Sequence, residues 1–142
     1  MPVDLPETPH LLLNPPTMAP ASGYSNAVVC APGRLVFLGG QTNLDAQGAR
    51  PGETLTEQMD VALANVVEAL AAAGGAPQHL VWMQIFVTDA AAYRSSTREL
   101  GAIYRRHLGK HYPAMALFEI SGLYYPESQV ELMCIAVVPE QA

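Results

Sequence analysis

The chain has 142 residues, of which 50% are apolar and 14% are charged, and its formal net charge is −6. This length and apolar content predict one globular domain. The excess of acids argues against a nucleic-acid partner, and no apolar run reaches the roughly 18 to 20 residues of a membrane span. The start, Met1-Pro2-Val3-Asp4, lacks the basic end and apolar run of a secretory signal, so we expect a cytoplasmic protein.

Residues 1–22 contain six of the twelve prolines. Proline excludes helix and removes backbone donors, so this segment is predicted to be an extended arm. Within it, Leu11-Leu12-Leu13 can form a short edge strand. Residues 23–142 are predicted to form the single domain.

Two β-type runs, Tyr24 to Cys30 and Arg34 to Leu38, are predicted to form a hairpin. Ala31-Pro32-Gly33 between them suits a type II turn, with Pro at the first central position and Gly at the second. Gly39 and Gly40 follow, and their missing side chains let another backbone or a ligand approach closely. We therefore include both glycines in the candidate binding site.

The clearest helix begins at the capping box Thr54-Leu55-Thr56-Glu57 and has apolar residues at spacings of three and four. Gly74-Gly75 ends it by allowing a left-handed cap. The next run, Leu80 to Val87, is uncharged and β-favouring, so it is predicted to be a central strand that is buried on both faces.

Thr88-Asp89 can cap a second helix, which ends near Gly109. Two final strands are predicted over residues 114–121 and 129–138. The order is therefore β-β-α-β-α-β-β. It predicts an α+β, two-layer sandwich with one β-sheet and two helices packed on one face.

Conventional nucleotide-binding, hydrolase, metalloprotease and redox motifs are absent, and we predict neither a metal nor a cofactor. His107 and His111 have helical spacing, but Gly109 lies between them, so we expect a solvated helix end rather than a metal pair. Cys30 and Cys134 lie in apolar runs and are expected to be buried free thiols.

Five of the seven cations lie close together on the second predicted helix: Arg94, Arg98, Arg105, Arg106 and Lys110. Three of them, at positions 94, 98 and 105, fall on one helical face opposite the tyrosines. That face is either solvated or binds an acidic ligand or partner.

Two glutamates, Glu119 and Glu131, lie in apolar strands, where a carboxylate is costly unless it is hydrogen-bonded or functional. Each is either solvated at a strand end or acts in a pocket as a proton acceptor or water holder.

Several of these segments, in this order and spacing, resemble the Rid family of reactive-intermediate deaminases, also called the YjgF family and typified by RidA-like proteins. They lie between Tyr24 and Val138 and include Leu35-Val36-Phe37-Leu38-Gly39-Gly40-Gln41, Phe86-Val87-Thr88-Asp89, Tyr112-Pro113-Ala114 and Val130-Glu131. The resemblance implies a chorismate-mutase-like fold, a homotrimer with pockets between subunits, and cofactor-free hydrolysis of small enamines or imines to a carbonyl compound and ammonia.

The resemblance also implies roles for individual residues. Tyr24 matches a pocket tyrosine, Gly40 a pocket glycine and Glu131 a glutamate that holds the attacking water, so Tyr24 and Glu131 are the candidate catalytic residues. Met115 stands where the family has an arginine that binds the substrate carboxylate. Leu117 stands where a small polar residue or Cys is usual.

A methionine offers no hydrogen-bond donor to a carboxylate. We therefore expect weak turnover of 2-iminopropionate by the wild-type protein. The Met115→Arg variant is expected to gain activity or affinity for a carboxylate. A carboxylate substrate needs another anchor, and the arginine-bearing helix is the only cationic cluster in the chain. Met115, Leu117 and Glu119 complete the candidate substrate-binding set.

Two functions from different classes follow. The first is a divergent enamine or imine deaminase, and the second is a trimeric protein that binds or senses a small ligand without turnover. A ribonuclease activity attaches to some relatives, but the acidity of this chain and the lack of a His/Lys catalytic set argue against it.

Overall fold

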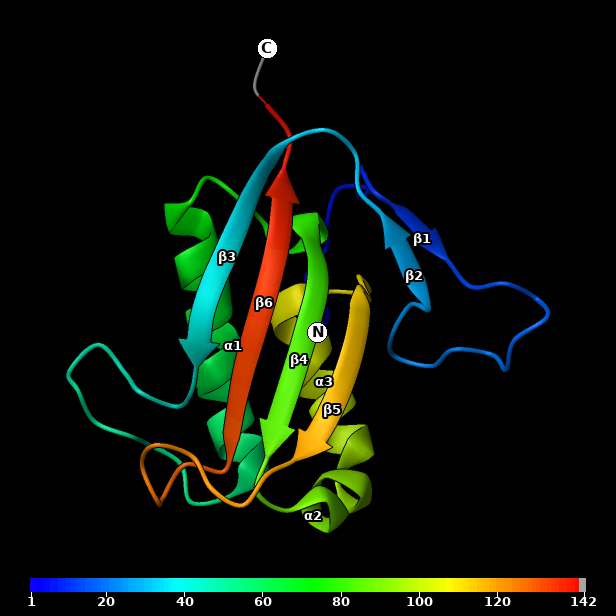
Figure 1. Ribbon diagram of the computed structural model, residues 1–142. Helices are drawn as coiled ribbons and strands as arrows, with labels where there is room; N and C mark the ends of the chain where they lie inside the picture. The colour runs from blue at the N-terminus through cyan, green and yellow to red at the C-terminus, as the bar shows by residue number, and fades with distance from the viewer. Residues whose placement is uncertain (141–142) are drawn as a thin grey trace.

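A computed structural model describes residues 1–140 and contains two layers, a four-stranded sheet and the helices on one of its faces (Figure 1). The sheet strands are β3 (Arg34–Gln41), β4 (Leu80–Val87), β5 (Ala114–Glu119) and β6 (Val130–Val138). The helices are α1 (Leu55–Ala72), α2 (Ala90–Ser95) and α3 (Thr97–Leu108), with a 3-10 turn, η1 (Pro77–His79), before β4. The predicted α+β two-layer sandwich is confirmed.

The sheet has the order β3-β6-β4-β5, so the last strand of the chain lies inside it. β6 is antiparallel to both β3 and β4, whereas β5 is parallel to β4. The two edges are therefore β3 and β5, and helices cover only one face. β4 alternates between fully buried and partly exposed side chains, so the prediction that both of its faces are buried holds only for the helix side.

The predicted hairpin between residues 24 and 38 is wrong. The segment β2 (Ala27–Val29) pairs with β1 (Leu11–Leu13) in a separate two-stranded ribbon, and β3 pairs with β6 instead. The type II turn does not form either, because Gly33 lacks the positive φ that this turn requires. A Cβ on Gly33 would lie 2.5 Å from the carbonyl oxygen of Val138, so Gly33 allows close packing against β6.

The helix α1 begins and ends where the sequence predicts. The side chain of Thr54 accepts a hydrogen bond from the backbone N–H of Glu57, and the Glu57 carboxylate accepts one from the N–H of Thr54. Gly74 has φ of 81°, and the N–H of Gly75 donates to the carbonyl of Leu70. Both termini are thus capped by local interactions that the sequence encodes.

The second predicted helix is broken in two. Asp89 caps α2 by accepting a hydrogen bond from the N–H of Ala92, as expected, but α2 ends at Ser95 and α3 begins at Thr97. The break changes the angular relation between residues before and after Ser96. The break separates Arg94 from Arg98 and Arg105, which both lie in α3.

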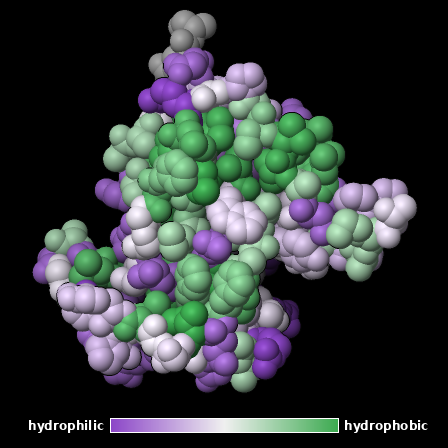
Figure 2. Space-filling model, viewed as in Figure 1, coloured by the Kyte–Doolittle hydropathy of each residue, from purple (hydrophilic) through white to green (hydrophobic). Residues whose placement is uncertain are grey.

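The sheet face opposite the helices is apolar and exposed. Side chains on it include Leu35 and Phe37 of β3, which are 60% and 70% exposed, and Phe118 of β5, which is 44% exposed. Figure 2 shows this face, with hydrophobic residues over much of β3, β6 and the β1-β2 ribbon. We call it the open sheet face.

Candidate functional site

Glu131 lies on the open sheet face, close to Gly40. Its neighbours in β6, Val130 and Leu132, are buried on the helix side, and alternation along the strand turns Glu131 the other way. A Cβ on Gly40 would lie 2.8 Å from both Cδ and Oε2 of the Glu131 carboxylate. The close approach expected at Gly39-Gly40 therefore occurs at Gly40, where the neighbour is the end of the Glu131 side chain, whereas nothing lies within 4 Å of a Cβ on Gly39.

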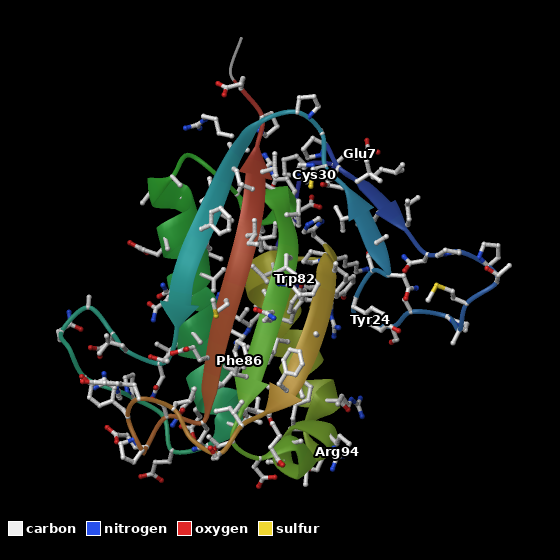
Figure 3. The ribbon with its side chains drawn as sticks, in the orientation of Figure 1. Glu7, Tyr24, Cys30, Trp82, Phe86 and Arg94 are labelled. Atoms are coloured by element: carbon white, nitrogen blue, oxygen red, sulfur yellow. The ribbon has the colours of Figure 1, made fainter. Side chains whose placement is uncertain are left out.

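Tyr24 lies beside the outer edge of β5 (Figure 3). The following residue, Ser25, forms a parallel bridge with Ala114, and its hydroxyl donates to the carbonyl of Tyr112 at 2.6 Å. The backbone N–H of Ser25 donates to the carbonyl of Pro113 at 3.0 Å. These bonds hold Tyr24, which is 39% exposed, against the start of β5.

Met115, Leu117 and Glu119 project from β5 on the helix side of the sheet. In the parallel pairing with β4 they lie opposite Met83, Ile85 and Val87, whose side chains are buried beneath the helices. Glu131, by contrast, pairs with Phe86 on the open sheet face. Within one chain the candidate residues therefore form two groups on opposite faces of the sheet.

A cavity of about 370 Å³ lies on the helix side, and Met115 contributes to it. Apolar side chains from α1, β4 and β6 line its inner end: Met59, Leu63, Met83, Ile85 and Leu132. Ser22 and Gly23, which directly precede Tyr24, line it from the other side. We call this space the helix-side cavity.

Helix α3 supplies groups to the helix-side cavity, and one of them belongs to the cationic cluster that the sequence offered as an alternative anchor for a carboxylate. Arg105 and Gly101 line it together with Tyr104, and Tyr93 of α2 adds a second ring. A Cβ on Gly101 would lie 3.1 Å from Nη1 of Arg105, so the guanidinium group lies over the backbone of Gly101. The four-residue spacing between Gly101 and Arg105 is the sequence signal that indicates this contact.

Burial changes the acidity of two of the three tyrosines that line the cavity. It raises the pKa of Tyr93, and it raises the pKa of Tyr104 further, with additional contributions from Tyr112, Cys134 and Tyr93. Both hydroxyl groups therefore stay protonated near neutral pH. The Tyr104 hydroxyl donates to the carbonyl of His111 at 2.6 Å, and its ring stacks on Tyr112 with centroids 5.3 Å apart.

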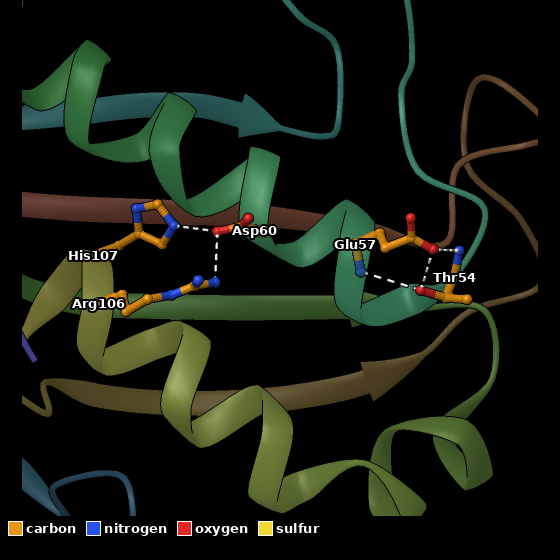
Figure 4. Close-up of polar contacts among 5 residues, drawn as sticks. All are labelled: Thr54, Glu57, Asp60, Arg106 and His107. Atoms are coloured by element: carbon orange, nitrogen blue, oxygen red, sulfur yellow. Dashed lines mark hydrogen bonds and ion pairs between the residues drawn. The ribbon is translucent and has the colours of Figure 1, made fainter. Parts of the chain in front are cut away.

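The cations of α3 have different partners. Arg106 and His107 both contact the Asp60 carboxylate of α1, at 3.1 and 2.6 Å (Figure 4). Nε2 of His111 instead donates to the carbonyl of Leu80 at 2.8 Å, so His107 and His111 do not form a pair. Within residues 1–140, no group of three His, Cys, Asp or Glu side chains is placed to hold a metal ion.

The two cysteines differ in their surroundings. Cys134 is buried, as expected, and burial raises the pKa of its thiol to about 12. The prediction for Cys30 is wrong, because its thiol is exposed. Cys30 follows β2, which belongs to the two-stranded ribbon and not to the packed sheet.

No helix in the described part of the chain is long and apolar enough to cross a membrane.

The sequence matches the family described as Endoribonuclease L-PSP over residues 15–138. Among solved structures, it is similar to YyfB of the Rid family from Yersinia pestis, with 27% identity, a TM-score of 0.83, and coverage of 91% of this chain and 98% of that one. No curated protein matches the sequence.

A second similar structure is Rv2704 from Mycobacterium tuberculosis, described as a member of the YjgF/YER057c/UK114 family. It is 32% identical, with a TM-score of 0.61 and coverage of 82% of this chain and 87% of that one. The YjgF protein of E. coli is 25% identical over 74% of this chain and 81% of its own, with a TM-score of 0.63. Because the match runs through the whole sheet and all three helices, the chain belongs to the Rid family, also called the YjgF family.

Proposed function

We propose that this protein hydrolyses a small enamine or imine to a carbonyl compound and ammonia without a cofactor. The observation that carries the proposal is the partly buried Glu131 carboxylate, which lies against Gly40 on a mainly apolar face of the sheet. A carboxylate beside apolar surface is well suited to bind and deprotonate a water molecule. Membership of the Rid family supports the reaction class.

The proposed chemistry needs one proton acceptor and a positioned water molecule. Glu131 takes a proton from the water, whose oxygen bonds to the imine carbon, and passes this proton to the imine nitrogen. The hydroxyl group of the resulting carbinolamine then gives its proton to Glu131, which passes one proton on to the amino nitrogen. The C–N bond breaks with its electron pair on nitrogen, neutral ammonia leaves, and the oxygen becomes the carbonyl oxygen. An enamine first takes a proton on its β-carbon. Tyr24 is assigned to the pocket wall.

The proposed site lies between subunits of a homotrimer in the cytoplasm. Two features support this assembly. Glu131 and Met115 face opposite sides of the sheet in one chain, so a second subunit is needed to bring the two groups together. The open sheet face also exposes several large apolar side chains, which is typical of surfaces that another subunit covers.

The test is Glu131→Gln, with ammonia release measured across a panel of freshly generated imines and enamines. Glutamine keeps the volume but cannot take a proton, so we expect normal folding and a loss of turnover of roughly 100-fold or more. Glu68→Gln, at an exposed position of α1, is the matched control and should keep full activity. Undiminished turnover in Glu131→Gln would contradict the assignment.

A second candidate function is binding of a small ligand without turnover. Met115 favours it, because a thioether stands where the resemblance implies the arginine that binds a substrate carboxylate for turnover, while Arg105 in the same cavity can still bind an acid. Absence of ammonia release from the whole panel, together with saturable binding of a product-like acid, would favour this alternative. We do not propose RNA cleavage, because the net charge of −6 disfavours a phosphate backbone.

A further inference from the structure

The helix-side cavity has one charged lining residue. Arg105 lines it, and no Asp or Glu does. Among residues 1–140, Asp60 is the carboxylate in contact with cationic or imidazole groups, those of Arg106 and His107, so no described carboxylate pairs with Arg105. An arginine cannot lose its proton in a protein, so its charge stays at the cavity wall.

The guanidinium group lies against the backbone of α3. Arg105 is partly buried, and its side chain runs back over Gly101, where a Cβ would lie 3.1 Å from Nη1. Its backbone carbonyl accepts hydrogen bonds from the N–H groups of Val3 and Gly109, both at 3.0 Å. A planar donor fork in the wall of a cavity is suited to bind a carboxylate with two hydrogen bonds.

The remaining lining of the cavity determines what else the ligand must be. Apart from Arg105 the lining is mainly apolar and includes Met59, Met83 and Met115, and its polar side chains are uncharged. Its volume of about 370 Å³ is at the lower end of the usual range for small-molecule sites, roughly 300 to 1,000 Å³. The lining therefore matches a small ligand with an anionic end and an apolar body.

We propose that the helix-side cavity binds a small carboxylate with an aryl or branched alkyl body, and that Arg105 binds its carboxylate group. The apolar body packs against the methionine side chains. This inference rests on the proposed function and deepens it by assigning the carboxylate contact to Arg105 of α3, because position 115, where the resemblance implies an arginine, is a methionine. Binding itself needs no turnover, so it can be tested separately.

The experiment measures calorimetric binding of 4-phenylbutyrate and of its neutral amide. The wild-type protein is expected to bind the acid at least about tenfold more tightly than the amide, because the charged contact is lost in the amide. Arg105→Gln should weaken acid binding by about 10- to 100-fold and leave amide binding nearly unchanged. Arg98→Gln, at an exposed position of the same helix, is the control and should bind like the wild type.

The methionine methyl groups report where the probe binds. NMR signals of Met59, Met83 and Met115 should shift on addition of the acid, whereas those of Met18 and Met133, which are outside the cavity, should not. The same spectra show whether Arg105→Gln is folded. Arg105→Lys, which keeps the charge but not the fork, should bind with intermediate affinity.

Three outcomes would overturn the inference: no saturable binding of the acid, equal affinity for acid and amide, or equal losses in Arg105→Gln and Arg98→Gln. Failure of the proposed catalysis gives a different pattern. In that case Glu131→Gln changes nothing because no turnover exists, while acid binding and its dependence on Arg105 remain.

Discussion

At the scale of single residues, the two glutamates of the last strands have different surroundings. The Glu119 carboxylate accepts a hydrogen bond from the backbone N–H of Ala90 at 2.9 Å, in the first turn of α2. Glu131 lies instead over Gly40 on the opposite face of the sheet. A carboxylate at a helix N-terminus satisfies a donor and interacts favourably with the helix dipole. Glu119 thus has a structural partner in the same chain, and its assignment to the substrate site stays a prediction.

Substitution of Glu119 separates these roles. Glu119→Ala removes the acceptor for the Ala90 N–H, so we expect the free energy of unfolding to fall by about 1 kcal/mol. Glu119→Gln keeps an acceptor oxygen, so its free energy of unfolding should fall less than that of Glu119→Ala. We expect its turnover of any imine substrate to be unchanged. Urea denaturation and ammonia release measure the two effects. Loss of turnover at unchanged stability would place Glu119 in the substrate site.

At the scale of elements, three histidines connect the N-terminal segment to the sheet and to the end of α3. Nδ1 of His10 accepts from the N–H of Ala31, and its Nε2 donates to the carbonyl of Val137 at 3.0 Å. Nδ1 of His79 accepts from the N–H of Ala76 in the turn before β4. With the bond from His111 to Leu80, these contacts satisfy backbone groups that neighbouring strands do not.

Protonation of this histidine group should destabilise the protein. Burial is the main cause that lowers the pKa of His79 and of His111, and the charge of His10 lowers both further, although the bond to Leu80 partly opposes this for His111. Below their ordinary pKa of about 6.5, the unfolded chain binds more protons than the folded one. The stability that these groups contribute is therefore complete above about pH 6.5 and is lost as the pH falls through the lower folded values.

Urea denaturation at several pH values between about 7.5 and 5 checks this expectation. His111→Gln retains a donor for the Leu80 carbonyl but does not titrate, so its stability should fall less steeply on acidification than that of the wild type. Carboxylates titrate in the wild type and in His111→Gln alike. The difference between the two proteins therefore excludes the contribution of carboxylates to the pH dependence of stability. Equal pH dependence in the two proteins would show that His111 is not a source of acid sensitivity.

At the scale of the whole molecule, the open sheet face predicts self-association. Phe37 is 70% exposed on β3, and on the same face Phe86 stacks on Phe118 with ring centroids 5.7 Å apart. We expect a trimer by sedimentation equilibrium at micromolar concentration. Phe37→Asp places a charge on this face and should dissociate the trimer, because desolvating the carboxylate opposes association. Met18→Asp, which is exposed away from the sheet, is the control.

A wild-type protein that sediments as a monomer would contradict this prediction and would also remove the pocket between subunits. Dissociation by both substitutions would indicate a general effect of added negative charge. The acid-binding experiment on the helix-side cavity gives its own answer in either case, since one chain supplies Arg105 and the apolar lining.

The sequence by itself determined the elements whose ends and faces depend on local interactions. The capping box at Thr54, the left-handed Gly74 and the apolar spacing between them predicted α1, and Asp89 predicted the start of α2. The sequence also predicted the family, because several short segments that lie in or next to the strands of the sheet occur in the order and spacing typical of that family. The groups that interact in these helix caps lie within a few residues of one another, so the local sequence pattern predicts the contact directly.

Only the tertiary structure decided the contacts between distant segments. β2 pairs with β1 and not with β3, which leaves Cys30 exposed, because strand partners depend on long-range packing that a local turn signal does not report. Arg105 likewise lines the cavity that Met115 lines, whereas Arg94 and Arg98, which the sequence placed on the same helical face, do not. The charge of Arg105 comes from α3 and the apolar lining of the cavity from other elements, and these segments meet only in the folded chain.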